Sequence, residues 1–243
     1  MSEFLEIAKK AAKAAGQLLK DNYGKDKVVD AFEEHDIKLQ LDVMSQSIIS
    51  DLILAAFPDH SILGEEGDAG SESGDYQWII DPIDGTVNYF FGIPHFCISI
   101  ALRQQSTDQW ILGVIYDPMM DELWAVDVGS EPTMNGSSIS TSDRGKMSEA
   151  VVTVGFSKTK DAMEAGFIRY REISSQVRKS RMMGSAALAL AYIACGRLDA
   201  YIEEVISLWD IAAGKLLVEA AGGRVDLTDS KVMKGKLSIC SWN

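Results

Sequence analysis

The sequence predicts an α/β protein, with an α+β N-terminal half over residues 1–142 and an α/β C-terminal half over residues 143–243. In the first half, two stretches with helical spacing of apolar residues precede several runs of β-favouring residues. In the second half, strand-like and helix-like stretches alternate, which is the order of α/β folds. At 243 residues the chain can bury a sizeable core as one large domain or two closely packed halves, and residues 140–148 are the candidate boundary.

The N-terminal half is expected to begin with two helices. Apolar residues recur at helical spacing over residues 2–22, with lysines between them, and Gly24 ends this amphipathic stretch. A second helix is expected over about residues 42–57, where Pro58 closes it. The polar run over residues 67–74 is expected to be a loop, because apolar periodicity resumes on both sides of it.

From Phe96 onward the pattern becomes that of β-strands, and later of alternating strands and helices. Polar or proline-containing turns separate the apolar runs, which favours antiparallel strands, and Asn135-Gly136 is a hairpin-type turn. The expected strands of the first half cover residues 96–102, 110–116 and 122–126. The expected elements of the second half are a strand over 151–155, helices over about 161–178 and 185–195, a strand over 198–203 and a helix over 210–221.

One stretch of the N-terminal half combines the features of a metal site. Residues 78–80 are apolar and β-favouring, which predicts a short buried strand that leads into a turn stiffened by Pro82. That turn carries Asp81 and Asp84, and two hard oxygen donors on a rigid turn suit Mg²⁺ better than a soft metal. The alternative is an ordinary surface turn built from common turn residues.

The residues after this turn have the features of a phosphate cradle. Gly85 carries no side chain at the point where a ligand would approach the backbone. If a helix begins there, the N–H groups of Gly85, Thr86 and Asn88 would suit a phosphate.

Composition and charge exclude some classes of partner. The formal net charge of -13 argues against a nucleic-acid-binding face, since phosphate backbones select for Lys and Arg. Cys97, Cys195 and Cys240 form no C-x-x-C pair, which is typical of reduced core cysteines in a cytosolic protein. The N-terminus lacks a signal-peptide pattern, and the apolar run over residues 186–195 is too short to span a bilayer. We therefore expect a cytoplasmic protein with neither nucleic-acid nor membrane partners.

Three segments together resemble the signature of a known family: Ile62-Leu63-Gly64-Glu65-Glu66-Gly67, the run from Asp81 to Asn88 that reads D-P-I-D-G-T-V-N, and Leu208-Trp209-Asp210-Ile211-Ala212-Ala213-Gly214. They are similar to those of the inositol monophosphatase family of Mg²⁺-dependent, lithium-sensitive phosphatases. The likeness extends to Asn135-Gly136 and to Gly184-Ser185-Ala186, and so covers nearly the whole chain. The resemblance implies a layered αβαβα sandwich of the sugar-phosphatase type, with the active site between the halves, and a homodimer.

The resemblance also implies the metal ligands. One Mg²⁺ would be held by Glu65, Asp81 and the carbonyl of Ile83, and a second by Asp81, Asp84 and Asp210. From the sequence alone, Asp210 has a second interpretation as a helix N-cap, and both can hold at once. Two metal ions about 3.5 to 4 Å apart neutralise the phosphoryl oxygens, activate water and stabilise the leaving alkoxide.

Further positions match the family in catalysis and in substrate binding. Thr86, with its acidic partner Asp42, would help to activate the attacking water, with Glu65 as the third catalytic residue. Asp84, Asp210 and the N–H groups of Gly85 and Thr86 would contact the phosphate. Glu203 would contact the inositol hydroxyls beside Gly184, Ser185 and Ala186. The alternatives are a strand-end charge for Glu203 and a helix start for the Gly-Ser-Ala run.

The sequence departs from the family pattern in one place. The family usually has D-x-V-T-x-x-D before the second helix, with a lysine further upstream. Here Asp36 and Asp42 stand, but Lys38 and Leu39 replace the valine and threonine, and Ala31 falls at the lysine's place. A third, weaker Mg²⁺ is therefore in doubt, and the expected number is two or three per site.

The leading hypothesis is Mg²⁺-dependent hydrolysis of an inositol monophosphate, a small phosphorylated polyol, to inositol and phosphate. Related metal-dependent phosphatases suggest three other substrates: fructose 1,6-bisphosphate, histidinol phosphate and 3′-phosphoadenosine 5′-phosphate. Glu203 favours a polyol over a nucleotide. An alternative from another class is a regulatory binding protein that retains the fold, as some bacterial relatives act on the transcription machinery.

Overall fold

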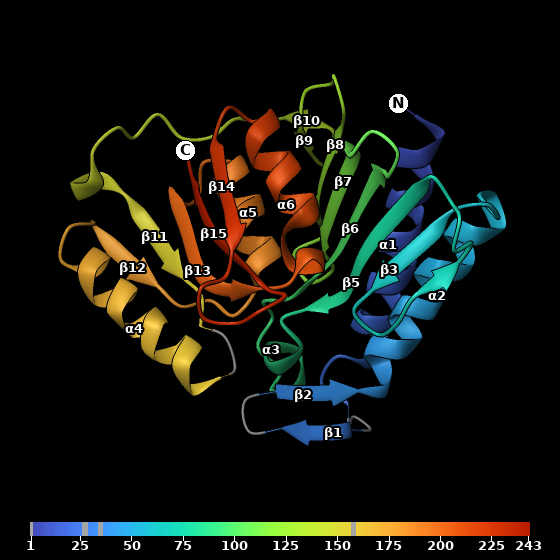
Figure 1. Ribbon diagram of the computed structural model, residues 1–243, viewed down its shortest axis with the longest axis horizontal. Coiled ribbons are helices and arrows are strands. Elements are labelled where there is room, and N and C mark those ends of the chain that lie inside the picture. The colour runs from blue at the N-terminus through green and yellow to red at the C-terminus, as the bar shows by residue number, and fades with distance from the viewer. Residues whose placement is uncertain (1, 26–28, 34–35, 157–158) are drawn as a thin grey trace.

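A computed structural model describes residues 2–25, 29–33, 36–156 and 159–243, and for residues 29–33 and 36–38 it describes the backbone alone. Within these ranges the chain forms six α-helices around an eight-stranded and a five-stranded sheet, with a separate two-stranded hairpin. Figure 1 shows the two large sheets on either side of a central pair of helices. None of the helices in the described ranges is long and apolar enough to cross a bilayer.

Helices α1 (Glu3–Asn22) and α2 (Gln40–Ala56) lie side by side on the outer face of the large sheet. The α1 helix begins where the Ser2 hydroxyl accepts a hydrogen bond from the Leu5 N–H at 3.3 Å. Its alanine stripe is buried, which lets α1 approach the sheet closely. The predicted helices are confirmed, although α2 begins two residues earlier than expected.

The large sheet is mostly antiparallel. Its strands, in spatial order, are β10 (Ser137–Ser138), β9 (Thr133–Met134), β8 (Glu122–Asp127), β7 (Gln109–Asp117), β6 (Cys97–Gln104), β5 (Tyr76–Asp84), β3 (Ser61–Gly64) and β4 (Ala69–Gly70). Strands β3 and β5 are parallel, and this pairing brings their carboxyl ends to the same edge. The three strands predicted after Phe96 are confirmed. So is the turn at Asn135-Gly136, where both residues have positive φ and connect β9 to β10.

The small sheet is built from the C-terminal half. Its strands, in spatial order, are β12 (Lys179–Arg181), β11 (Val151–Val154), β13 (Ala200–Ile206), β15 (Leu237–Trp242) and β14 (Arg224–Asp229). The helices of this half are α4 (Lys160–Ser174), α5 (Ala186–Ala194) and α6 (Leu208–Ala220). The α4 helix ends four residues earlier than predicted, because the N–H groups of Arg178 and Lys179 donate to the Ala150 carbonyl and start β12. The sequence analysis did not predict β12, β14 or β15.

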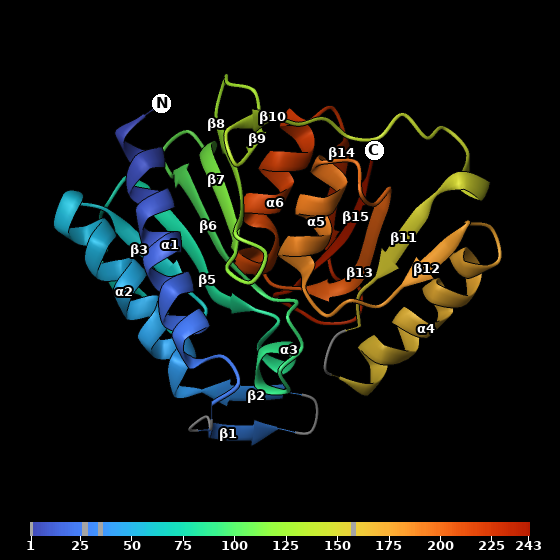
Figure 2. The same ribbon diagram turned by 180° about the vertical axis from the view of Figure 1, so that it is seen from behind.

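The layers follow the order α1 and α2, large sheet, α5 and α6, small sheet, α4 (Figure 2). The expected αβαβα sandwich is therefore confirmed. The α5 helix is buried on nearly all sides, since sheets and α6 surround it, and this explains its almost wholly apolar sequence. The division into halves at residues 142 and 143 remains a proposal. The large sheet precedes this point and the small sheet follows it.

A hairpin and a short helix lie below the carboxyl end of β5 in Figure 1. Strands β1 (Val29–Glu33) and β2 (Asp36–Leu39) pair antiparallel, with Ala31 opposite Lys38. The short helix α3 (Thr86–Phe90) follows β5 directly. These elements, with the first turn of α2, surround the point where β5 delivers its carboxylates.

The central helices α5 and α6 approach each other closely at Gly214. A Cβ at this position would lie 2.5 Å from both the Cβ and the Cδ1 of Leu190. The glycine of the W-D-x-x-x-G segment is thus needed for helix packing, and this packing holds Asp210 beside the large sheet.

We expect Gly214→Ala to lower the free energy of unfolding by about 1 kcal/mol. Alanine gains about 1 kcal/mol of helix propensity over glycine, but overpacking a tight core costs roughly 1 to 3 kcal/mol. Urea unfolding measures the difference. Leu190→Ala is the matched background, in which the same substitution should cost less. A Gly214→Ala protein that is more stable than wild type would contradict this packing argument.

Candidate active site

Three carboxylates from distant parts of the chain meet where the end of β5 approaches the first turn of α6. One ligand oxygen from each of Asp81, Asp84 and Asp210 lies within 4.8 Å of the others. Asp81 and Asp84 come from β5, and Asp210 from the first turn of α6. Asp81 and Asp84 are buried and Asp210 is partly buried. The structure therefore brings together three of the four predicted carboxylate ligands in one cluster.

The segment that carries Asp81 and Asp84 is a bulged strand rather than a turn. Strand β5 runs through to Asp84, but its four residues from Asp81 to Asp84 oppose three residues of β6, from Ser99 to Cys97. Pro82 has no N–H to donate to the neighbouring strand, so the ladder breaks there. The Ile83 N–H turns back and donates to Asp81 Oδ1 at 3.0 Å. The expectation of a turn was wrong in form, and a bulge also serves to re-aim the two acids.

The Asp84 carboxylate joins the end of β5 to the start of α5. Its Oδ2 accepts hydrogen bonds from the Ser185 hydroxyl and from the Ala187 N–H, both at 2.6 Å. Ser185 is also the N-cap of α5, accepting from the Leu188 N–H. The structure thus places Ser185 and the first turn of α5 in direct support of Asp84. Sequence reasoning expected a substrate contact there and did not predict this link.

Asp42 and Thr86 form a second acid centre beside the cluster. The Thr86 hydroxyl lies 3.1 Å from Asp42 Oδ1 and 2.9 Å from the Ile83 carbonyl oxygen. A hydroxyl has one proton, so at any moment it donates to one of the two acceptors. Asp42 Oδ2 accepts from the Leu39 N–H at 2.8 Å, at the start of α2. The predicted pair is therefore in hydrogen-bond contact.

Glu65 follows β3 and lies against the cluster. Its charge and a hydrogen bond with Asp81 both raise the pKa of Asp81. The loop is held by Gln46, whose Oε1 accepts from the Glu66 N–H at 2.9 Å and whose Nε2 donates to the Gly67 carbonyl at 2.8 Å. Gly64 leaves the space that Gln46 occupies, since a Cβ there would overlap its amide. A glycine is therefore needed at position 64, because the Gln46 amide that holds the loop occupies the space of its side chain.

Burial and mutual repulsion make the cluster electrostatically costly. Burial, with the charges of Glu65, Asp84 and Asp210, raises the pKa of Asp81 well above its usual value. Burial also raises the pKa of Asp84 to about 6, although hydrogen bonds from the start of α5 lower it. Asp210 keeps some exposed surface, but its carboxylate lies inside the cluster, and burial raises its pKa to about 6. Burial raises the pKa of Asp42 to about 7.

Gly85 and Gly184 meet at the edge of the cluster. Both have positive φ, and a Cβ at Gly85 would lie 3.2 Å from the Gly184 carbonyl oxygen. The Asn88 amide donates to the Met183 carbonyl at 2.9 Å and to the His95 carbonyl at 2.8 Å. This close packing fixes the position of the expected phosphate cradle, Gly85 and Thr86, against the loop over residues 183–185.

Glu203 lies on β13 of the small sheet, whereas Asp81 and Asp84 lie on β5 of the large sheet. It is 9% exposed, and its Oε2 accepts a hydrogen bond from the hydroxyl of the buried Tyr201. Gly155 makes room for it, because a Cβ there would overlap the carboxylate. Burial is the main cause of the raised pKa of Tyr201. The charges of Asp84 and Asp210 raise it further, which is in keeping with a ring near the acid cluster. Tyr201 is a supporting residue that sequence reasoning missed.

Lys236 is a cation beside the acids that the sequence analysis also missed. Its ammonium donates to the Ser207 hydroxyl at 2.5 Å and lies 5.3 Å from the centre of the Trp209 ring. The N-cap of α6 is Ser207 rather than Asp210, so the N-cap interpretation of Asp210 was wrong. Asp210 is the third residue of the helix, and its Oδ2 accepts from the Ser207 N–H at 2.8 Å in a capping box while the carboxylate also joins the cluster. The Lys236 charge lowers the pKa of Asp210 against the effect of burial.

The sequence departs from the family pattern around the β1–β2 hairpin. The structure does not describe the side chains of Ala31, Asp36 and Lys38. His35 between the two hairpin strands is also outside it. Leu39 is buried at the start of α2 and packs in the core.

The donor set fits a hard divalent cation. The oxygens come from carboxylates, without a thiolate or imidazole in the cluster formed by the described residues, and this is the ligand chemistry of Mg²⁺. A cation would also offset the mutual repulsion that raises these pKa values.

In EDTA we expect the protein to lose stability as the pH rises from about 4 to about 7. A folded-state pKa near 7 for Asp42, above its ordinary 3.8, means that the folded state holds a proton that the unfolded state releases across this window. Above about pH 7, the raised pKa of Asp42 lowers the free energy of unfolding by an amount on the order of 4 kcal/mol. Melting temperatures between pH 5 and 8 measure the slope.

Asp42→Asn keeps the acceptor for the Leu39 N–H and removes one titrating group, so its melting temperature should fall less steeply. Equal slopes for this variant and for wild type would show that Asp42 titrates normally.

Comparison with known proteins finds relatives that match nearly the whole chain. A tomato (Solanum lycopersicum) protein named inositol monophosphatase 2 is 36% identical over 234 residues, which span 93% of this chain and 87% of the relative. A Pasteurella multocida protein named Nus factor SuhB is 37% identical over 230 residues, 93% of this chain and 85% of the relative. Among solved structures, the inositol monophosphatase of Anabaena (Nostoc) sp. PCC 7120 is 38% identical with a TM-score of 0.84, and the match covers 99% of this chain and 90% of that one.

The extragenic suppressor protein suhB of Bartonella henselae has a TM-score of 0.91 at 33% identity, with 100% of this chain and 94% of that chain covered. The model of one family matches residues 1–242. With the acid cluster, the bulged strand and the layered sheets in place, the chain belongs to the inositol monophosphatase family.

Proposed function

We propose that this protein hydrolyses a phosphate monoester with the help of Mg²⁺, and that its substrate is an inositol monophosphate. Membership of the family supports a phosphatase. The observation that carries the proposal is the cluster of Asp81, Asp84 and Asp210 with the Thr86 and Asp42 pair beside it. It gives one site both a place for cations and a proton acceptor.

The carboxylates have separate tasks in this proposal. Glu65, Asp81 and the Ile83 carbonyl would hold one Mg²⁺, and Asp81, Asp84 and Asp210 a second. Bound there, two or three Mg²⁺ ions would neutralise phosphoryl oxygens and lower the pKa of a water molecule. The bulge at Pro82 fixes Asp81 and Asp84 relative to each other, and α5 holds Asp84 through Ser185.

Thr86 and Asp42 would take the proton from the attacking water. The Thr86 hydroxyl can donate its own proton to Asp42 while its oxygen accepts one from water. A pKa of about 7 for Asp42, raised by burial, suits a general base near neutral pH. Glu65, whose charge acts on Asp81, would complete the set of catalytic residues.

The polyol preference rests on Glu203. A buried carboxylate oriented by Tyr201 is a good acceptor for substrate hydroxyls and a poor neighbour for a second phosphate. This favours an inositol monophosphate over fructose 1,6-bisphosphate or 3′-phosphoadenosine 5′-phosphate. Histidinol phosphate, which carries an ammonium group, is the other substrate that a carboxylate could accept.

A second candidate function has a specific observation in its favour. Several relatives at 34 to 38% identity carry the name Nus factor SuhB rather than the name of a phosphatase. A regulatory role as a binding protein that keeps this fold is therefore the alternative. It does not require the acid cluster to be lost.

We also propose a homodimer in the cytoplasm. Phe91 and Ile93 follow α3 and are 67% and 48% exposed, and Met182, on the loop held by Asn88, is 59% exposed. Exposed apolar groups on neighbouring loops are typical of a surface that another chain covers. The free state of Cys97, Cys195 and Cys240 is in keeping with a reducing compartment.

Asp81→Asn should nearly abolish hydrolysis and leave the protein folded. An amide is a poor substitute for a carboxylate shared by both proposed cations, and losing one like charge should stabilise the protein in EDTA. The matched control is Asp117→Asn, a buried aspartate outside the cluster, which should keep its activity. Activity of Asp81→Asn within about tenfold of wild type, or roughly 1.4 kcal/mol of barrier, would remove the basis of the assignment.

Glu203→Gln should lower kcat/KM for inositol 1-phosphate by the value of one charge-assisted hydrogen bond, roughly 1.5 to 3 kcal/mol. A small aryl phosphate has no ring hydroxyls and should be nearly unaffected, so the pair of substrates separates recognition from catalysis. Glu204→Gln on the same strand is the matched control, since Glu204 pairs with Arg169 instead. Equal losses with both substrates would assign Glu203 to the metal site or the fold. No loss with either would make fructose 1,6-bisphosphate the preferred substrate.

A further inference from the structure

An open hollow with charged residues in its lining lies at the opposite end of the small sheet from the acid cluster. Its volume is about 400 Å³, and it is lined by Arg144, Glu149, Val151, Arg178 and Arg197. Val151 begins β11, whereas Gly155, just beyond the end of this strand, lies against Glu203. The length of β11 therefore separates the hollow from Glu203 and the proposed substrate site.

Arg144 is held rigidly at the rim of this hollow. Its Nε donates to Asp199 Oδ1 at 2.7 Å, and its Nη2 donates to the Gly196 carbonyl at 2.8 Å. Asp199 is 2% exposed and also accepts from the Ser142 hydroxyl and the Val151 N–H. These bonds leave Nη1 of Arg144 without a partner among the described residues. A positioned guanidinium with unused donors loses little freedom when it binds an anion.

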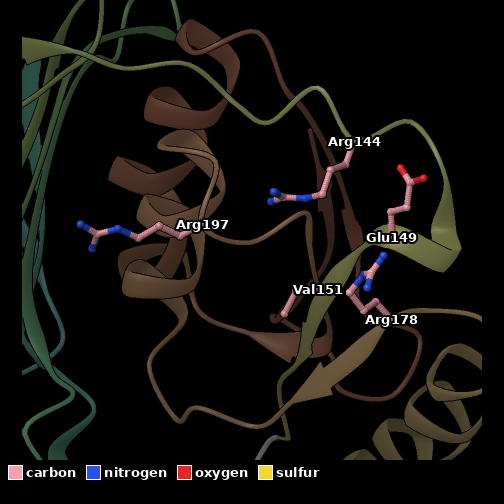
Figure 3. Close-up of a pocket in the computed structure, with 5 residues that line it drawn as sticks. All are labelled: Arg144, Glu149, Val151, Arg178 and Arg197. Atoms are coloured by element: carbon pink, nitrogen blue, oxygen red, sulfur yellow. The ribbon is translucent and has the colours of Figure 1, made fainter.

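Arg178 supplies the charge that is not compensated. Its side chain is exposed and forms no hydrogen bond or ion pair with the rest of the described chain, while its N–H holds the backbone in place through the Ala150 carbonyl. Glu149 lies beside Arg178 in Figure 3 and gives the lining one negative charge, which an exposed ion pair with Lys146 at 3.8 Å weakens only slightly.

Arg197 takes a different role from the other two arginines. Its side chain points away from the other four lining residues (Figure 3). It forms two bonds of 2.5 and 2.6 Å with Glu122 and stacks over Tyr192. Of the three lining arginines, Arg178 is the one without an ion pair among the described residues, while Arg144 keeps an unused donor although it pairs with Asp199.

We propose that this hollow is a second anion site, which binds a phosphate group between Arg144 and Arg178. Two guanidinium groups offer the paired N–H donors that tetrahedral phosphate oxygens accept. The group can belong to free inorganic phosphate or to a phosphate ester, and the volume leaves room for the ester's remaining atoms. The site is independent of the proposed phosphatase activity, because none of its residues contributes to the acid cluster.

The test uses the full-length protein in EDTA, titrated by calorimetry with inorganic phosphate and, separately, with glycerol 2-phosphate. Without Mg²⁺ the acid cluster repels anions, so binding reports on the hollow, and no ester is hydrolysed. Sodium chloride of equal ionic strength serves as the reference, because exposed charge interactions are screened by salt. Arg178→Ala removes the uncompensated charge without breaking a described contact, whereas Arg144 supports Asp199 and is left intact.

We expect saturable binding that Arg178→Ala weakens by at least about tenfold, the value of one charge-assisted hydrogen bond. Glu149→Gln should tighten binding, because it removes the one negative charge from the lining. Lys13→Ala on α1 removes a positive charge far from the hollow and should leave binding unchanged. Tighter binding of glycerol 2-phosphate would identify an ester as the ligand, and equal affinities would identify free phosphate. Absence of saturable binding to wild type, or equal losses for Arg178→Ala and Lys13→Ala, would overturn the proposal.

Discussion

The bond between Asp84 and the start of α5 is the constraint on which the rest of this structure depends. Asp84 belongs to the large sheet, and the Ser185 hydroxyl and Ala187 N–H that it accepts belong to the other half. This carboxylate therefore sets where α5 begins. Because α6 packs on α5 at Gly214, it also sets where Asp210 stands. A cluster of like charges can form between two halves because its own members align them.

Glycines in and near the motif segments act through space as much as through conformation. Gly64 and Gly155 leave space for the Gln46 amide and the Glu203 carboxylate, and Gly214 lets two helices touch. Gly85 and Gly184 combine both roles, because each has positive φ and lies in close contact with neighbouring atoms. The glycines of these motif segments are therefore needed for close packing around the site residues as well as for the site itself.

The sequence predicted the helices and central strands well, because buried periodic faces give strong patterns. It did not predict β14, whose residues are mostly exposed or half-buried, nor β12, which has three residues, since neither has a clear apolar face. The proline and two aspartates after Ile80 suggested a turn, but pairing with β6 keeps this segment in the sheet as a bulge. The acids were identifiable by their motifs. Lys236 was not, because its role depends on a contact across 29 residues that only the fold defines. Tyr201 lies two residues before Glu203 on a predicted strand, so alternation along the strand could have placed it on the same face.

Two acids of the site also begin helices. Asp42 accepts from the Leu39 N–H at the start of α2, and Asp210 accepts from the Ser207 N–H at the start of α6. A descendant that abandoned catalysis would still be under pressure to keep both, because losing a helix cap costs about 1 kcal/mol. Asp81 and Glu65 have no such role in starting a helix. In comparing relatives, the survival of Asp42 and Asp210 is thus weak evidence for an active enzyme, and the survival of Asp81 and Glu65 is strong evidence.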